Sequence, residues 1–354
     1  MNMYQKIKNQ GYYLIAEIGV NYYDIAKKEH ISLMDAAKLM MKEAVDAGID
    51  AVKFQTYKAE TLAAKNSPSY WDTSEETTTS QFELFKKYDL FGEKEYIELS
   101  KYAKELHVDF LSTPFDFQSA DYLEDLMPSY KISSSDLSNI PFIEYMSKKG
   151  KPILLSVGAS NKDEIDAAVS VISENNNNVL TLLHCVLEYP TPYEHANLLK
   201  IQSLAETYPE AIIGYSDHTK PDECMDVIKT AYLFGAKVIE KHFTLDKTLP
   251  GNDHYHAMNP EDLRKIKAGL EFIQKIKGEK ELKCLDTEKT ARMNARRSIV
   301  TTCAIEPGQR IERSMLTFKR PGTGITPGRI DEIVGKTASR RLEEDTILTE
   351  KDFR

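Results

Sequence analysis

Cysteine is scarce in this sequence, and its spacing excludes two common kinds of scaffold. The four cysteines in 354 residues are Cys185, Cys224, Cys284 and Cys303, and no two of them form a CxxC pair. This spacing argues against a zinc knuckle and against a disulfide framework. We therefore expect reduced thiols that are mostly buried.

Long hydrophobic runs are also missing. The composition is 41% hydrophobic and 29% charged, and no stretch approaches the roughly 18 apolar residues that a membrane span requires. The N-terminal segment MNMYQKIKNQGYY has no apolar stretch before a small-residue cleavage site. We therefore expect a globular protein of the cytoplasm, with no membrane partner.

Positive charge is not in excess, because the formal net charge is -9. Nucleic acid phosphates bind surfaces rich in Lys and Arg, so no nucleic-acid partner is expected. The phosphate-binding patterns GxxxxGKS/T and GxGxxG do not occur near a strand-to-helix turn, which disfavours a nucleotide as the ligand.

What the sequence does contain is a regular alternation of short apolar runs and amphipathic stretches. This alternation predicts βα units, and eight consecutive units favour a closed TIM (β/α)8 barrel over an open doubly wound sheet. The expected strands span residues 13–20, 51–56, 109–115, 130–133, 152–158, 181–185, 212–217 and 237–243.

The composition changes after the last expected barrel helix. Residues 284–296 are polar and charged, as is typical of a linker. Residues 297–354 have short β-type runs and turn signals such as EPGQ and RPGTG, which predict a small β-rich domain. We therefore expect a barrel domain at 1–283, a linker at 284–296 and a second domain at 297–354.

One connection within the expected barrel, residues 57–90, is unusually long and includes the only tryptophan, Trp71. Connections of this length in compact domains are usually lids or interaction segments, with a surface excursion as the alternative.

Many polar side chains fall inside or just after the expected strands. In a TIM barrel the chemistry lies at the carboxyl ends of the strands, and a buried charge is costly unless it is paired or bound. For any single residue a structural ion pair is the alternative, but the set together indicates a functional site. The set comprises Glu17, Lys53, Lys131, Ser133, Ser134, Asp136, Ser156, His184, Asp217, His218, Glu240, Lys241 and His242.

His218 and His242 are the strongest candidates for metal ligands. They follow adjacent strands, so their imidazoles could meet at one Mn²⁺, Co²⁺ or Zn²⁺ ion acting as a Lewis acid on a carbonyl. His184 is an intermediate candidate, and we expect His254 and His256 to make contacts at the rim.

Lys53 and Lys131 are expected to face one another across the barrel mouth, close to the hydroxyls of Ser134 and Ser156. Cations combined with hydroxyls are what a phosphate or carboxylate group requires. Two alternatives stay open, a Schiff-base lysine and ordinary salt bridges to nearby carboxylates.

Eight motifs follow one another along nearly the whole chain: AEIGVN (16–21), KFQT (53–56), FLSTPFD (110–116), YKISSSD (130–136), LLHCVLEYPTPYE (182–194), GYSDHT (214–219), IEKHFTLDK (239–247) and KRPGTGI (319–325). In order and spacing they resemble the sialic acid synthase family, which includes N-acetylneuraminate, legionaminate and pseudaminate synthases and their spore-coat relatives.

The resemblance implies a TIM barrel followed by an antifreeze-like (SAF) domain, in a domain-swapped homodimer. It implies a C–C bond-forming transferase that condenses phosphoenolpyruvate with an N-acylated mannosamine-type sugar, giving a nonulosonic acid and phosphate. Another TIM-barrel aldolase or condensing enzyme and an inert carbohydrate-binding homologue are the alternatives.

The resemblance also implies roles for individual residues. A divalent metal, Mn²⁺ with Mg²⁺ or Co²⁺ as alternatives, is expected on His218 and His242. The expected phosphoenolpyruvate ligands are Lys53, Lys131, Ser134 and Ser156.

The remaining implied roles concern the sugar and proton transfer. Tyr189 is expected on the sugar side, and Arg320 is expected to reach the sugar's N-acyl group from the second domain of a partner copy. Glu17, Asp136 and Asp253 are expected to serve metal-bound water, proton transfer or sugar hydroxyls.

Three positions depart from the family pattern. Asp136 stands where a glutamate is usual, Leu187 where sialic acid synthases often have an asparagine, and Asn252 where a proline is common. The last two bear on substrate choice and leave N-acetylmannosamine and a 2,4-diacetamido-6-deoxy sugar as alternatives.

Overall fold

The computed structural model describes residues 1–71, 73–74, 76–251 and 253–354. Asn252, one of the three departures, therefore lies outside the described residues. The chain divides into two compact units, Met1–Gly278 and Glu279–Arg354, and each is described by itself.

Eight parallel strands form the centre of the first unit. In the sheet they follow the order β3-β2-β1-β8-β7-β6-β5-β4, and the end strands β3 and β4 also lie in contact, so the sheet curls into a nearly closed barrel. The predicted TIM barrel is thus confirmed. The strands are β1 (Tyr13–Gly19), β2 (Ala51–Thr56), β3 (Asp109–Pro114), β4 (Tyr130–Ile132), β5 (Ile153–Ser156), β6 (Thr181–Cys185), β7 (Ile212–Asp217) and β8 (Val238–His242).

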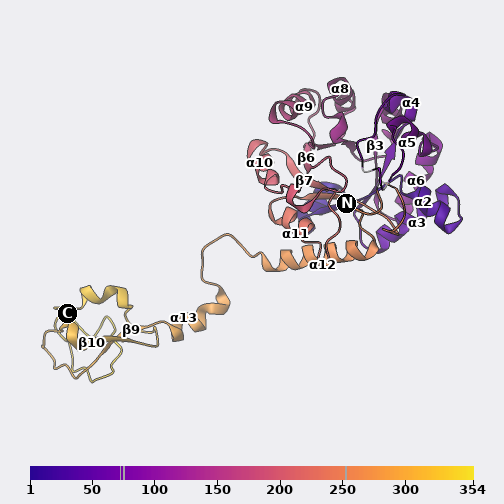
Figure 1. The fold of residues 1–354 in the computed structure, drawn as a ribbon. Coiled ribbons are helices and arrows are strands. Elements are labelled where there is room, and N and C mark those ends of the chain that lie inside the picture. Colours follow the sequence, from indigo (N-terminus) through magenta and orange to yellow (C-terminus); the bar gives the residue numbers. More distant parts are fainter. Residues whose placement is uncertain (72, 75, 252) are drawn as a thin grey trace. The chain divides into compact units, whose positions relative to one another are not determined.

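Helices surround this barrel, as Figure 1 shows. They are α1 (Met3–Gln10), α2 (Tyr22–Glu29), α3 (Leu33–Asp46), α4 (Ala59–Leu62), α5 (Gln81–Lys87), α6 (Glu93–Glu105), α7 (Phe117–Leu123), α8 (Ile140–Lys148), α9 (Lys162–Asn175), α10 (Lys200–Thr207), α11 (Asp226–Leu233) and α12 (Pro260–Ile276). Local sequence fixes several starts: Asn161 and Glu164 form a reciprocal capping box on α9, and Asn259 and Asp262 form one on α12.

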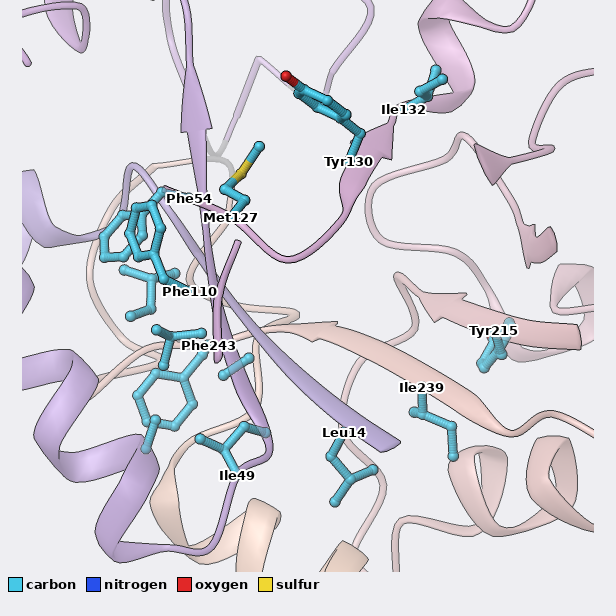
Figure 2. Close-up of a cluster of buried hydrophobic side chains, with 14 of the residues drawn as sticks. Leu14, Ile49, Phe54, Phe110, Met127, Tyr130, Ile132, Tyr215, Ile239 and Phe243 are labelled. Carbon is cyan, nitrogen blue, oxygen red and sulfur yellow. The ribbon is translucent and has the colours of Figure 1, made fainter. Parts of the chain in front are cut away.

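The outward-facing strand residues pack against the helices as the main hydrophobic core. Figure 2 shows part of this cluster, with Leu14, Phe54, Phe110 and Ile239 drawn from four different strands. Because side chains alternate along a strand, the neighbours of these residues point into the barrel.

Inside the barrel, the side chains change from apolar to polar along the strand direction. The apolar layer packs as one cluster, with Met3 of α1 beneath it, and comprises Tyr13, Ile15, Ala51, Leu111, Leu154, Leu183 and Val238. The next inward position on each strand is polar. Glu17, for example, pairs in register with Lys53 on one side and His242 on the other. The polar layer is therefore built by the same alternation that builds the core.

The second unit is small and β-rich, as predicted. It contains α13 (Lys289–Ala295) and the antiparallel strands β9 (Ser298–Thr301) and β10 (Leu316–Lys319). Its own core comprises Ile299, Ile305, Ile311, Leu316, Ile325, Ile333, Ala338, Leu342 and Leu348.

Short 3₁₀ helices occur in both units. They are η1 (Ser134–Asp136), η2 (Tyr193–His195), η3 (Asp286–Glu288), η4 (Arg313–Met315) and η5 (Pro327–Glu332).

The cysteines differ from expectation. All four thiols are free, but only Cys185 is buried, whereas Cys224, Cys284 and Cys303 are exposed. The expectation of mostly buried thiols was wrong because three of the cysteines lie on turns and surface segments. Among the described residues, no helix is both long enough and apolar enough to cross a membrane.

Candidate active site at the carboxyl end of the barrel

A cavity of about 350 Å³ opens at the carboxyl ends of the strands. All eight strands contribute lining residues to it: Glu17, Lys53, Thr113, Lys131, Ser156, Cys185, Ser216, Glu240 and His242. Ser134, Asp136, Tyr189 and His218, which follow strands directly, line it as well. The structure therefore gathers most of the candidates from the sequence into one cavity.

Two lysines and two glutamates form a buried charge network on one wall. Nζ of Lys53 forms an ion pair with Oε2 of Glu17 and lies 3.7 Å from Oε1 of Glu240. Nζ of Lys131 lies 3.5 Å from the same Oε1. All four side chains are less than a tenth exposed. Sequence analysis included Glu240 only in the general set, but the structure shows that it bridges both lysines.

The two carboxyls of this network have pKa values shifted in opposite directions. Burial, together with the neighbouring Glu240, raises the pKa of Glu17 against the opposing effect of Lys53. Burial also acts to raise the pKa of Glu240, but Lys131 and Lys53 outweigh it and hold that pKa below its ordinary value. Two buried lysines thus lie beside these carboxyls at the cavity, and ammonium groups of this kind suit the binding of an anion.

Serine hydroxyls lie beside the lysines. Oγ of Ser134 accepts a hydrogen bond of 2.8 Å from the amide of Gly158. A Cβ at Gly158 would lie 2.9 Å from that same oxygen, so glycine permits this close approach. Oγ of Ser156 is buried and has no hydrogen-bond partner among the described residues. A buried hydroxyl in this state is available to a ligand.

His218 and His242 also line the cavity, with their ring centroids 5.6 Å apart. Nδ1 of His218 donates to the carbonyl of Val186 at 2.7 Å, which leaves Nε2 with its lone pair. Nδ1 of His242 is buried without a hydrogen-bond partner in the described part of the chain. Burial, with His256 and His218 nearby, lowers the pKa of His242 well below its ordinary value, so its imidazole is neutral.

Two further residues approach His242 more closely than the sequence suggested. One ligand atom from each of His242, Asp253 and His256 lies within 4.8 Å of the others. His256 is fully buried, so the expectation that it forms a rim contact was wrong. Its position depends on the fold of the loop after β8, which no periodic pattern reveals.

Aromatic side chains line the cavity beside the histidines. The Tyr189 ring lies 4.2 Å from that of His218. The long connection 57–90 contributes Tyr57, Tyr70 and Phe85 to the cavity, while Trp71 is buried beside it and donates to the carbonyls of Glu76 and Thr78. Asp136 is partly exposed in the cavity, and burial raises its pKa.

Some polar residues at the strand ends lie outside the cavity. Asp217 and Lys241 form a buried ion pair of 2.5 Å on the outer side of the barrel. His184 is also directed outward, with Nε2 2.8 Å from the carbonyl of Ala196 and its ring stacked on Tyr215. Asp217, Lys241 and His184 therefore make structural contacts with the protein itself, which was the alternative to a role in the site. Arg320 is exposed in the second unit.

The fold and the cavity define a TIM-barrel protein whose strand-end site combines buried lysines and carboxyls with a cluster of imidazoles. The chain belongs to the NeuB family, whose model matches residues 40–282. A SAF domain matches residues 296–354.

Relatives match nearly the full length of the chain. An uncharacterized protein of Methanocaldococcus jannaschii is 37% identical, covering 96% of this chain and 94% of its own. The N,N'-diacetyllegionaminic acid synthase of Campylobacter jejuni is 36% identical, covering 95% and 98%. The N-acetylneuraminic acid synthetase structure from Leptospira borgpetersenii is 33% identical with a TM-score of 0.68, covering 79% of this chain and 90% of that chain.

Proposed function

We propose that the protein condenses phosphoenolpyruvate with an N-acylated mannosamine-type sugar, giving a nonulosonic acid and phosphate. The observation that carries this proposal is that two buried lysines, two serine hydroxyls and the imidazoles of His218 and His242 line one cavity. Named relatives that are synthases of this class support it.

Lys53, Lys131, Ser134 and Ser156 would bind phosphoenolpyruvate. Its phosphate and carboxylate groups require cationic and hydroxyl donors, and the network supplies both. The hydroxyl of Ser156, which has no partner among the described residues, would be satisfied by this anion, and the buried lysines would attract it.

The histidines fit a divalent metal. The unpartnered Nδ1 of His242 and the Nε2 of His218 offer imidazole nitrogens as ligands, which suit Mn²⁺ or Co²⁺. When bound, such an ion stabilises negative charge that develops on a carbonyl oxygen.

The reaction forms one C–C bond and breaks one C–O bond. Carbon 3 of phosphoenolpyruvate attacks the aldehyde carbon of the open-chain sugar, water adds at carbon 2, and the bond between carbon 2 and the phosphate oxygen breaks. Glu17 and Asp136 would hold or accept the proton of this water, because burial raises the pKa of both carboxyls toward the working range of a general base.

The sugar would occupy the aromatic side of the cavity. Tyr189 and Leu187 line that side, and Asp253 lies in an adjoining cavity that shares Tyr189 and His242. Arg320 of a partner copy in a homodimer would contact the N-acyl group.

Phosphate release tests this proposal. Purified protein with phosphoenolpyruvate and Mn²⁺ is offered N-acetylmannosamine and 2,4-diacetamido-2,4,6-trideoxymannose in separate reactions, each with an EDTA control. Metal-dependent release with one sugar supports the proposal and identifies the substrate. Folded protein that releases no phosphate with either sugar contradicts it.

A Schiff-base aldolase is the second candidate, since burial lowers the pKa of Lys131 and would favour a neutral amine. Borohydride with pyruvate would trap such an enzyme covalently at Lys131, and EDTA would leave it active. The condensing enzyme shows the opposite pattern.

A further inference from the structure

We propose that His256 is an additional metal ligand, so that the site combines the imidazoles of His218, His242 and His256 with the carboxylate of Asp253. This inference rests on the metal use of the proposed function and extends it to residues beyond the histidine pair. It is carried by the positions of these side chains.

The three imidazole rings lie close together, at centroid distances that two ligands of a single ion can have. Their ring centroids are 4.9 Å apart for His242 and His256, 5.6 Å for His218 and His242, and 6.2 Å for His218 and His256. A ring bound to metal has its centroid about 3.2 Å from the ion, given a metal–nitrogen distance of about 2.1 Å. Two such rings are therefore about 4.5 to 6.2 Å apart at angles between about 90° and 150°.

A carboxylate completes the group. Oδ2 of Asp253 lies 3.9 Å from Nδ1 of His242. One ligand atom from each of Asp253, His242 and His256 lies within 4.8 Å of the others. This spacing leaves room for one ion between them. Burial of both imidazoles distinguishes the group from chance surface clusters of acidic residues.

The loop that carries Asp253 and His256 is firmly held. Met258 donates its amide to the carbonyl of His242 at 2.7 Å, two residues after His256. The imidazole of His254 joins Oγ1 of Thr244 at 2.8 Å to Oδ2 of Asp24 at 3.3 Å. Anchors on both sides of His256 hold the backbone of this segment in place before any ligand binds, which is part of the preorganisation that metal sites require.

The anchoring continues on the other side of the loop. The side-chain amide of Asn21 donates to the carbonyls of Phe243 and Asp253 at 3.0 and 3.3 Å. The loop is thereby joined to the segment that leads into α2.

Three imidazoles and one carboxylate form a nitrogen-rich ligand set. Such a set binds Co²⁺ and Zn²⁺ more tightly than Mn²⁺, and Mg²⁺ weakly, because imidazole favours the later divalent ions. The proposed class of ligand is therefore a borderline transition-metal ion.

Metal binding without substrate tests the assignment. Full-length apo-protein is titrated with Co²⁺ by calorimetry and followed by visible absorption, comparing wild type, His256→Gln and the control His195→Gln. His195 is an exposed histidine paired with Glu188. We expect His256→Gln to weaken Co²⁺ binding about 10- to 100-fold and to change the absorption spectrum, with no change for the control. Wild-type affinity and spectrum in folded His256→Gln would overturn the proposal.

A second measurement uses the wild-type protein only, so it does not depend on whether a variant folds. Pulsed EPR of wild-type protein loaded with Mn²⁺ alone counts the coordinated imidazole nitrogens. Three coordinated imidazole nitrogens would support the assignment, and two would overturn it. Because neither readout needs turnover, an inactive protein that binds metal through three histidines would contradict the proposed reaction and leave this site intact.

Discussion

Lys131 and Glu240, on strands that are not neighbours in the sheet, meet inside the barrel with Nζ and Oε1 3.5 Å apart. The same oxygen accepts a hydrogen bond of 3.1 Å from Ser216 and lies 3.7 Å from Lys53. Glu240 is thus the shared counter-charge of both lysines. A substitution at Glu240 therefore tests how the buried charge network supports the site.

Glu240→Gln is expected to lower the free energy of unfolding by about 3 kcal/mol, because two buried ammonium groups lose their common carboxylate. Inorganic phosphate should restore part of this loss by binding between the lysines. Urea denaturation with and without phosphate measures both effects.

A surface network provides the matched control for Glu240→Gln. Lys149 pairs with Asp121 and Glu124 at 2.7 Å each, at the surface. Glu124→Gln should change the free energy of unfolding by less than about 1 kcal/mol. Equal effects of the two substitutions would show that burial does not strengthen the internal network.

Ser156→Ala should stabilise the protein by about 1 kcal/mol while weakening phosphoenolpyruvate binding about tenfold. The hydroxyl of Ser156 is buried without a partner in the described residues, so the free protein gains when it is removed, and the bound ligand loses a donor. Thermal melts and calorimetry with phosphoenolpyruvate measure the two effects.

Thr181→Val is the control for Ser156→Ala. Oγ1 of Thr181 is equally buried and unpartnered within the described chain, but it lies at the start of β6, outside the cavity. Thr181→Val should stabilise the protein without altering its affinity for phosphoenolpyruvate. Unchanged phosphoenolpyruvate affinity in Ser156→Ala would remove Ser156 from the anion site.

Lys131→Met should weaken phosphoenolpyruvate binding about 10- to 100-fold, the effect of losing a hydrogen bond from a buried charge. Lys42→Met, at an exposed lysine paired with Asp46, should leave the affinity unchanged. Calorimetric titration of both variants gives the comparison. If both substitutions leave the dissociation constant at its wild-type value, the lysine wall does not bind the anion.

The outer pair of Asp217 and Lys241 predicts a pH dependence of stability. Burial acts to raise the pKa of Asp217, but Lys241 and the amide of Thr219 outweigh it and hold the pKa below its ordinary value. Because this pKa is lower in the folded than in the unfolded state, the ionised carboxylate stabilises the folded protein above the unfolded-state pKa of about 3.9. This stabilisation is lost as the pH falls below that value.

Asp217→Asn should therefore cost about 3 kcal/mol at pH 7, and the difference from wild type should shrink as the pH falls below about 4. Urea titrations between about pH 2 and 7 measure this difference. A difference that is constant across the range would mean that the carboxylate charge of Asp217 is not what stabilises the fold.

The barrel and much of its polar layer could be predicted because both follow from strand alternation. Glu17 and Lys53 occupy inward positions of apolar strands, and the same parity places Glu240 and His242 inward but Lys241 outward. The sequence alone could not separate these three neighbours. Which residues of a short strand face the barrel interior is set by the register of that strand with its neighbours.

Other features depend on loop conformation and on contacts between distant segments. His256 comes 14 residues after the end of β8, and its position is fixed by bonds such as the one from His254 to Asp24. No local pattern encodes such a contact. The role of Arg320 stays a prediction from family resemblance.

Carbon-bond formation is the central claim, and one labelling experiment tests it directly. Protein, Mn²⁺ and the accepted sugar are incubated with [3-¹³C]phosphoenolpyruvate and followed by ¹³C NMR. We expect the label to move to a methylene carbon that is bonded to the former aldehyde carbon of the sugar, in step with phosphate release. Label recovered as the methyl group of pyruvate would show hydrolysis without condensation and would contradict the account.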